Sequence, residues 1–142
     1  MRFQFYKQSD IQHVIICSMP KLLFLDDIRN PQDAFAYTHQ EVFMEEHWEI
    51  VRSFEQFIDW IETNGLPDFV SFDHDLADVH SADYNSIKSV DEYKEKTGYD
   101  CALWMVNYCM DNRLKCPAFY CHSMNLVGRD KIFGLLEQFS RV

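Results

Sequence analysis

Three short apolar segments of this chain end in acidic, histidine or hydroxyl side chains. The polar clusters are Asp26-Asp27 after residues 21–25, Asp73-His74-Asp75 after residues 69–72, and His122-Ser123, with Asn125 close behind, after residues 117–121. Short apolar runs of this kind are typical of strands buried in a parallel sheet. Because ligands of such sheets bind outside the carboxyl ends of the strands, we expect the three clusters to form one site.

The carboxylates of this expected site favour a divalent cation. Converging carboxylates repel one another, so either their pKa values rise or a cation enters. Mg²⁺, or Mn²⁺ in its place, suits an all-oxygen site in which substrate phosphate is a further ligand. We therefore predict four metal ligands: Asp26, Asp27, Asp73 and Asp75. In the alternative interpretation these acids only cap loops and helix starts, as Asp often does.

Two histidines stand beside the acids at the expected strand ends. Histidine titrates near neutral pH, which suits it to give and take protons during phosphodiester cleavage. We therefore predict His74, His122 and Asp73 as the catalytic residues. Each histidine could instead be a hydrogen-bonded structural residue.

A phosphate-binding role is predicted for the start of the last helix. Free backbone N–H groups and the helix dipole favour an anion there, and an arginine adds a bidentate contact. Ser123, Asn125 and Arg129 lie at this point, and Arg29 faces them from the first strand's loop. The alternative for each arginine is a solvated surface position.

Strand and helix patterns alternate along the chain. These elements must position the candidate site residues. Strands are predicted at 21–25, 48–52, 69–72 and 117–121, and helices after Ser53, over 99–113 and around 132–139. Residues 30–47 are predicted as a loop with room for one short helix, and residues 77–98 as a long polar loop. The alternation predicts an α/β fold with an open parallel sheet of about four strands and helices on both faces.

Composition limits the class of protein. The 142 residues suit one domain, predicted over 20–142, with residues 1–19 as an N-terminal extension that includes a candidate added strand. A net charge of −10 without a basic run disfavours binding to duplex DNA.

No apolar run is long enough to cross a bilayer and no secretory signal is evident, so we expect a cytoplasmic protein. The five cysteines lack metal or disulfide spacing and are expected to be reduced.

Four stretches of the chain resemble the motifs of one family. They are Leu25-Asp26-Asp27-Ile28-Arg29-Asn30-Pro31, Phe72-Asp73-His74-Asp75-Leu76, Thr97-Gly98-Tyr99-Asp100 and His122-Ser123-Met124-Asn125-Leu126-Val127-Gly128-Arg129. In this order they resemble the cyclic-phosphate-processing receiver domains, a divergent group of the response-regulator receiver fold. The resemblance spans about residues 21–139. It implies a receiver-like, flavodoxin-like sheet, an acidic pair that holds Mg²⁺, and a cyclic-phosphate ligand on a nucleotide or an RNA end.

Two departures from ordinary receivers disfavour phosphorelay signalling. His122 and Ser123 stand where receivers have a switch threonine, and the chain ends before a fifth strand that would supply the usual lysine. We therefore predict a metal-dependent phosphoesterase, a hydrolase that processes a cyclic phosphate such as a 2′,3′-cyclic phosphate. The alternatives are a non-catalytic module that sequesters a phosphorylated nucleotide and a receiver that is phosphorylated on Asp73.

Overall fold

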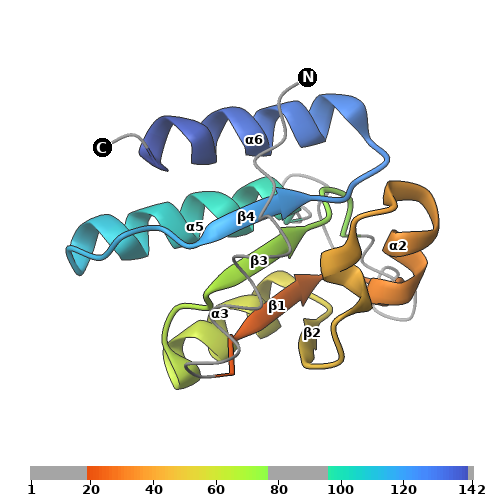
Figure 1. The fold of residues 1–142 in the computed structure, drawn as a ribbon. Coiled ribbons are helices and arrows are strands. Elements are labelled where there is room, and N and C mark those ends of the chain that lie inside the picture. The colour runs from red at the N-terminus through yellow and green to blue at the C-terminus, as the bar shows by residue number, and fades with distance from the viewer. Residues whose placement is uncertain (1–18, 77–95, 141–142) are drawn as a thin grey trace, which may run out of the picture.

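The computed structural model describes residues 19–76 and 96–140, which form a parallel sheet with helices on both faces (Figure 1). In chain order the elements are β1 (Leu22–Leu25), α2 (Pro31–Thr38), a 3₁₀ helix η1 (Glu41–Met44), β2 (Trp48–Val51), α3 (Phe54–Asn64), β3 (Phe69–Phe72), α5 (Gly98–Asp111), β4 (Ala118–Cys121) and α6 (Leu126–Ser140). The candidate added strand near the N-terminus and residues 77–95 of the predicted polar loop lie outside the described residues. The division into an extension and one domain therefore stays a prediction.

The four strands confirm the predicted open parallel sheet. Their order is β2-β1-β3-β4, and every neighbouring pair is parallel. This is the order of the first four strands in flavodoxin-like, receiver-like folds. The chain turns to opposite sides of β1 when it forms β2 and β3, so the switch point of the topology lies between β1 and β3. A ligand of this fold is expected at the carboxyl ends of these two strands.

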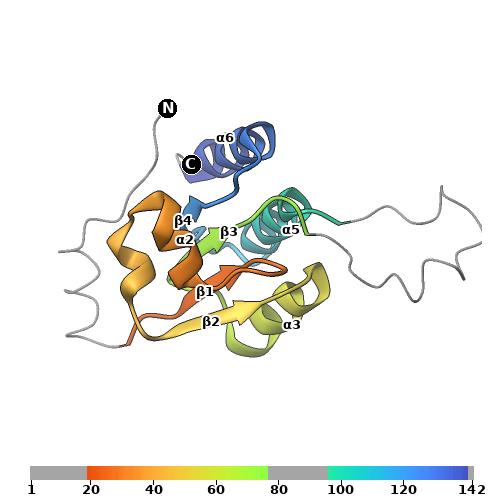
Figure 2. The same ribbon diagram turned by 90° about the vertical axis from the view of Figure 1, so that its right-hand side faces the viewer.

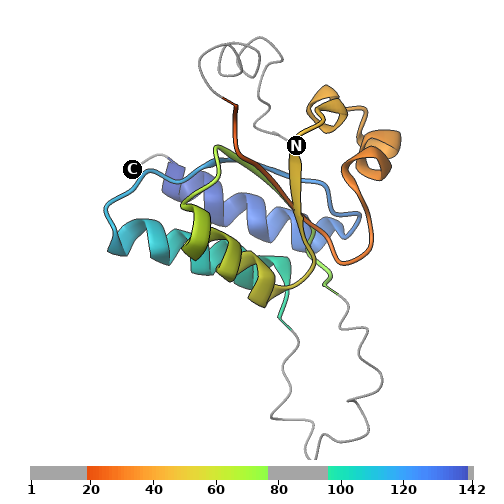
Figure 3. The same cartoon turned by 90° about the horizontal axis from the view of Figure 1, so that it is seen from below.

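The two faces of the sheet carry unequal layers. Side chains alternate along each strand, so alternate residues of β1, β3 and β4, together with Val51 of β2, pack against α3, α5 and α6 in the larger core cluster. Residues on the other face form a smaller cluster with α2 and η1. Figure 2 shows α2 on one side of the sheet and α3 with α5 on the other, and Figure 3 shows α3, α5 and α6 as one layer. Helices on both faces are confirmed, and within residues 19–76 and 96–140 one short helix and one 3₁₀ turn cover the thinner face.

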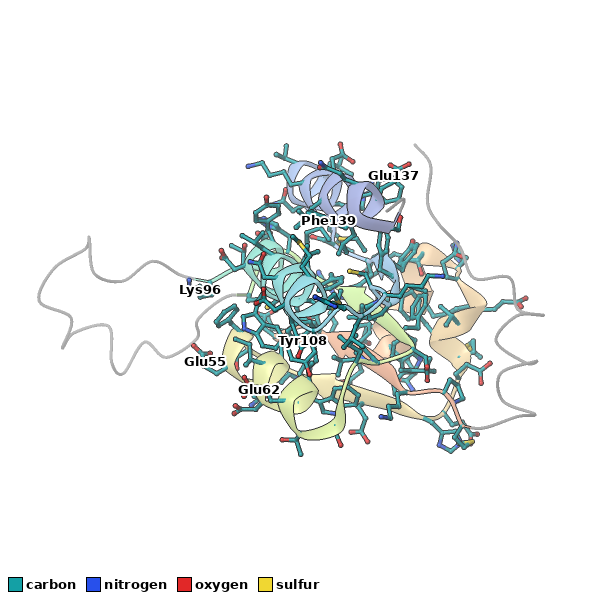
Figure 4. The ribbon with its side chains drawn as sticks, turned by 90° about the vertical axis from the view of Figure 1, so that its left-hand side faces the viewer. Glu55, Glu62, Lys96, Tyr108, Glu137 and Phe139 are labelled. Atoms are coloured by element: carbon teal, nitrogen blue, oxygen red, sulfur yellow. The ribbon has the colours of Figure 1, made fainter. Side chains whose placement is uncertain are left out.

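Helix α3 forms largely as its sequence predicts. Ser53 caps it by accepting a hydrogen bond from the Gln56 backbone N–H at 3.1 Å. The Gln56 side chain accepts a hydrogen bond from the backbone N–H of Arg52 rather than from that of Ser53, so the reciprocal bond of a capping box is shifted by one residue. Phe57 and Ile61 of the apolar stripe are fully buried. Figure 4 labels Glu55 and Glu62, two of the exposed acids of α3.

Residues 30–47 contain more helix than the sequence prediction allowed. Asn30 and Asp33 form a capping box around the start of α2, and Pro31 occupies its first position, where the missing N–H costs nothing. Helix α2 covers the thin face of the sheet and brings Tyr37 to the carboxyl end of β4, where its hydroxyl donates to the His122 carbonyl at 2.6 Å. None of the helices within the described ranges is long and apolar enough to cross a membrane.

Candidate functional site

The register of the sheet brings three predicted site residues together. Leu25, Phe72 and Cys121 end their strands side by side, so Asp26, Asp73 and His122 follow at adjacent positions. Strand alternation turns all three toward the α2 face. All three are buried, and one potential ligand atom from each lies within 4.8 Å of the others. The predicted meeting of the strand-end clusters is therefore seen at the switch point.

His122 is enclosed between Asp26 and Ser71. Its Nε2 lies 3.0 Å from Asp26 Oδ2, its Nδ1 lies 2.7 Å from Ser71 Oγ, and its ring stacks on Phe24 at 4.3 Å. Burial lowers the pKa of His122, although the hydrogen bond to Asp26 opposes that shift. The neutral ring donates from Nε2 to Asp26 and accepts at Nδ1 from the Ser71 hydroxyl. His122 thus holds Asp26 in place.

Asp26 is a stable anion despite its burial. Burial alone would raise its pKa, but the hydrogen bond from His122 and those from the backbone of Arg29 and Ile28 lower the pKa to about 2. The two backbone N–H groups reach Oδ1 at 2.7 Å and 2.9 Å. Arg29 Nη1 lies 3.8 Å from the other oxygen. Asp26 therefore carries a full negative charge at neutral pH.

The same surroundings raise the pKa of Asp73. Burial and the charge of Asp26 raise its pKa to about 6, while bonds from the His74 backbone N–H and the Ser123 hydroxyl oppose the shift. Two neighbouring buried carboxylates with this imbalance fit a cation, because a positive charge would offset their repulsion. Carboxylate oxygens are also the donors that Mg²⁺ and Mn²⁺ prefer. The donor set of this chain therefore fits the predicted metal, and Asp26 and Asp73 could supply buried ligands for it.

A cavity of about 270 Å³ opens beside Asp73. Acidic, cationic and hydrogen-bonding side chains line it, as a site for a metal-bound phosphate requires. The lining residues that the sequence predicted are Asp27, Arg29, Asp73, Asp75, Ser123 and Asn125, and Ile28 with Met124 completes the wall. We call this the acidic cavity. The guanidinium of Arg29 is one-third exposed, which leaves it accessible to a ligand there.

His74 is not part of the cavity lining, but it contacts two residues that are, Asp75 and Asn125. Its Nδ1 lies 2.8 Å from Asp75 Oδ1, and the Asn125 amide donates to both oxygens of Asp75 at 3.1 Å and 3.3 Å. The hydrogen bond with His74 lowers the pKa of Asp75. Gly128 packs against the imidazole so closely that a Cβ there would lie 2.2 Å from the ring. The side chain of His74 is 16% exposed, so it can reach a ligand, whereas His122 cannot.

The Thr97-Gly98-Tyr99-Asp100 motif positions Asp73 through the backbone. Thr97 and Asp100 form a capping box at the start of α5. Gly98 begins the helix and donates its N–H to the His74 carbonyl at 2.7 Å. A Cβ at Gly98 would lie 1.7 Å from the carbonyl oxygen of Asp73, so only glycine fits. This motif brings no side chain into the lining of the acidic cavity.

Arg129 lies apart from the other predicted phosphate-binding residues. It lines a second cavity, of about 350 Å³, together with Tyr37 and Tyr120. Ser123 and Met124 line both cavities and thus form the wall between them. Arg29 and Arg129, which were predicted to bind one phosphate from opposite loops, therefore serve neighbouring cavities in this structure.

Three residues of the site escaped the sequence analysis. Arg52 ties the first loop down by donating to the Asp26 carbonyl at 3.1 Å and to Asn30 Oδ1 at 2.6 Å. Its signal was its position directly after β2, level with Asp26. Ser71 could have been suspected as a hydroxyl inside an otherwise apolar strand. Tyr37 gave no signal, because it lies in the segment predicted as a loop with room for one short helix.

Comparison with protein-family models agrees with this geometry. Residues 21–138, from β1 into the last turn of α6, match the cyclic-phosphate processing receiver domain. Neither the comparison with curated proteins nor that with solved structures finds a match. The matched range contains all four motifs on which the resemblance was based, together with the strand-end acids. The chain therefore belongs to the family of cyclic-phosphate processing receiver domains.

Proposed function

We propose that this protein is a metal-dependent phosphoesterase that binds a cyclic phosphate and opens its ring. One observation carries the proposal: two adjacent buried carboxylates with opposite pKa shifts, Asp26 and Asp73, lie at the switch point beside the acidic cavity. Such a pair favours a cation, and the arginine and hydroxyl on the same cavity favour a phosphate. The family to which the chain belongs is associated with the processing of cyclic phosphates.

The proposed ligands divide between metal and phosphate. Asp26, Asp27 and Asp73 would hold Mg²⁺ or Mn²⁺, and Asp75 would support them. When bound, the cation would neutralise charge on the phosphoryl oxygens and orient the phosphate. Arg29, Ser123 and Asn125 would bind the remaining phosphate oxygens, with Arg129 acting from the second cavity. Fixed donors of this kind act most strongly in a site that excludes water.

The proposed reaction breaks one ester bond of the ring. A water oxygen attacks phosphorus and gives up one proton, one P–O bond to the alcohol breaks, and the leaving oxygen takes up one proton, which yields a phosphate monoester. His74, partly exposed and oriented by Asp75, is the group we assign to proton exchange with the ligand. His122 was predicted to share this role. Its burial supports a positioning role toward Asp26 instead.

Phosphorus NMR tests the proposal. The substrates are nucleoside 2′,3′-cyclic phosphates, an RNA oligomer with that terminus and 3′,5′-cyclic nucleotides, each with Mg²⁺. We expect a cyclic resonance to convert to a monoester with the wild type and not with Asp73→Asn. Asp59→Asn, which changes an exposed acid on α3, should convert at the wild-type rate. Lack of conversion of every substrate by folded wild type would contradict the enzyme proposal.

A non-catalytic binding module is the second candidate, and the burial of His122 favours it. With both His122 ring nitrogens hydrogen-bonded inside the protein, His74 remains, of the two histidines at the carboxyl ends of the described strands, the one that can meet a ligand. A protein of this kind would broaden the phosphorus resonance of a cyclic phosphate in the presence of Mg²⁺ without converting it. The same experiment therefore distinguishes the two candidates.

A further inference from the structure

The second cavity differs from the acidic cavity in its charge. It measures about 350 Å³ and shares Ser123 and Met124 with its neighbour. No Asp or Glu is present among the described residues that line it, and Arg129 supplies its permanent charge. In a chain with a net charge of −10, such a lining is unusual. The cavity therefore suits a group rich in hydrogen-bond acceptors and does not suit a second metal ion.

The remaining walls of the second cavity are amphipathic. Tyr37 supplies an aromatic ring, which is fixed because its hydroxyl donates to the His122 carbonyl. Tyr120 is 7% exposed and packs on Phe43, so it closes the cavity from the core side. Gln40 also lines the cavity, and its amide carries a donor at one end and an acceptor at the other. Aromatic faces and polar edges of this kind are how proteins bind unstacked nucleobases.

The two cavities are close enough to serve one ligand. Arg29 lines the acidic cavity, its guanidinium carbon lies 5.7 Å from the centre of the Tyr37 ring, and its Nη2 lies 3.5 Å from Met124 Sδ. Met124 is 58% exposed, and its flexible thioether can move aside for a bridging group. Together the cavities have the size of clefts that bind small molecules, which is about 300–1,000 Å³.

We propose that the second cavity is a nucleobase subsite, so that the ligand is a nucleoside cyclic phosphate rather than the cyclic phosphate of another alcohol. The phosphate lies in the acidic cavity, the ribose passes over Met124, and the base lies against the Tyr37 ring with its edge toward Gln40 and Arg129. This inference rests on the proposed function for the position of the phosphate.

The test compares two ligands that differ only in the base. Adenosine 2′,3′-cyclic phosphate and methyl riboside 2′,3′-cyclic phosphate, which has a methoxy group in place of the base, are titrated into the Mg²⁺-loaded protein. The readout is the dissociation constant, or KM where the ring opens. We expect the adenosine compound to bind at least about tenfold more tightly, which is about 1.4 kcal/mol. Gln40→Ala should reduce this ratio toward one, whereas Gln138→Ala, an exposed glutamine on α6, should preserve it.

Adenosine alone supplies an independent arm. In the subsite it should shift the amide resonances of Thr38, Gln40 and Met124 in a ¹H–¹⁵N spectrum. Equal affinity for the two cyclic phosphates overturns the subsite and leaves the proposed function intact. Failure of both cyclic phosphates to bind overturns the proposed function, and the adenosine shifts then decide the subsite by themselves: shifts support it and their absence overturns it.

Discussion

Asp26 and Asp73 show how surroundings rather than residue type set the charge of a site. Both are buried aspartates that directly follow neighbouring strands. Asp26 has a hydrogen-bonded histidine and two backbone N–H groups, which outweigh burial and bring its pKa to about 2. For Asp73 burial and the nearby Asp26 charge dominate, and its pKa is about 6. The pair can therefore exist as one anion and one acid until a cation or a rise in pH removes the second proton.

The opposite shifts predict separate pH windows for stability in the metal-free protein. The folded state holds the Asp73 proton more tightly than the unfolded state does, so the free energy of unfolding should fall as pH rises from 3.8 to about 6. Asn at this position cannot titrate, so Asp73→Asn should remove that decline, which is on the order of 1–3 kcal/mol. Urea unfolding at pH values across this window measures it.

The Asp26 contribution has the opposite sign and lies lower. Its folded pKa of about 2 is below the unfolded value of 3.8, so its stabilisation is present above pH 3.8 and is lost as pH falls through the folded pKa.

Asp59→Asn is the control for the Asp73 experiment, because Asp59 is exposed on α3. A decline of the same size in Asp73→Asn and Asp59→Asn would contradict the assignment to Asp73.

Ser71 offers a second prediction at the residue scale. Ser71→Ala removes the hydroxyl that donates to His122 Nδ1, which leaves a buried ring nitrogen without that partner. An unsatisfied buried polar group costs about 1–3 kcal/mol, so the urea midpoint should fall accordingly. Ser140→Ala, which removes an exposed hydroxyl bonded within α6, should change the midpoint little. Equal midpoints for the two variants would show that Ser71 does not support His122.

At the scale of elements, the starts of α5 and α6 shape the site through glycines. Gly98 lets α5 begin against the backbone of Asp73, and Gly128 lets α6 pass the His74 ring. The two contacts differ in whether the group that faces the glycine can move. A backbone carbonyl cannot move without disturbing β3, whereas an imidazole can rotate away. Motif glycines in this family member therefore serve close packing at strand ends.

The Gly98 contact predicts a loss of stability with a matched control. Gly98→Ala places a Cβ 1.7 Å from the Asp73 carbonyl oxygen, and such overpacking costs about 1–3 kcal/mol. Gly134→Ala changes a helical glycine of α6 with nothing within 4 Å of the new Cβ, and it should stabilise the protein by about 0.5–1 kcal/mol. Thermal unfolding of both variants measures the contrast. Similar shifts in both variants would mean that the start of α5 can move.

At the scale of the whole molecule, the site lies on the thinner face of the sheet. Three helices bury the other face, while α2 and η1 cover this one. Two of the strand side chains that point toward α2, Phe24 and Tyr120, pack in the smaller core cluster. The buried residues Asp26, Asp73 and His122 point the same way at the strand ends. A thin layer leaves room above these residues for the two cavities.

Metal binding should therefore be visible in the stability of the whole domain. A ligand that binds only the native state stabilises it, by about 2.7 kcal/mol at a concentration one hundredfold above its dissociation constant. We expect Mg²⁺ to raise the midpoint of thermal unfolding relative to EDTA at pH 7.5, and to raise it less at pH 5, where protons compete for Asp73. Asp73→Asn should lose most of the shift. An equal shift in wild type and Asp73→Asn would place the metal elsewhere.

Local sequence patterns by themselves determined the elements and the membership of the family. Strands β1, β3 and β4 were predictable because each is a short, mostly apolar run, and α3 because Ser53 caps an apolar stripe at helical spacing. The sequence prediction left room for one short helix in residues 30–47 without giving its bounds, because the signal of α2 is a polar capping box without a strong apolar stripe. The strand-end acids were found as candidates because parallel strands end at one edge.

The tertiary structure alone decided what each candidate can do. Strand register and the two-residue alternation of side chains turned His122 inward onto Asp26, and the start of α6 directed Arg129 to the second cavity. Both outcomes depend on contacts between residues far apart in the chain, which no local pattern encodes. Burial and pKa depend on the same contacts, so the opposite shifts of Asp26 and Asp73 follow from the packed sheet and not from the chain.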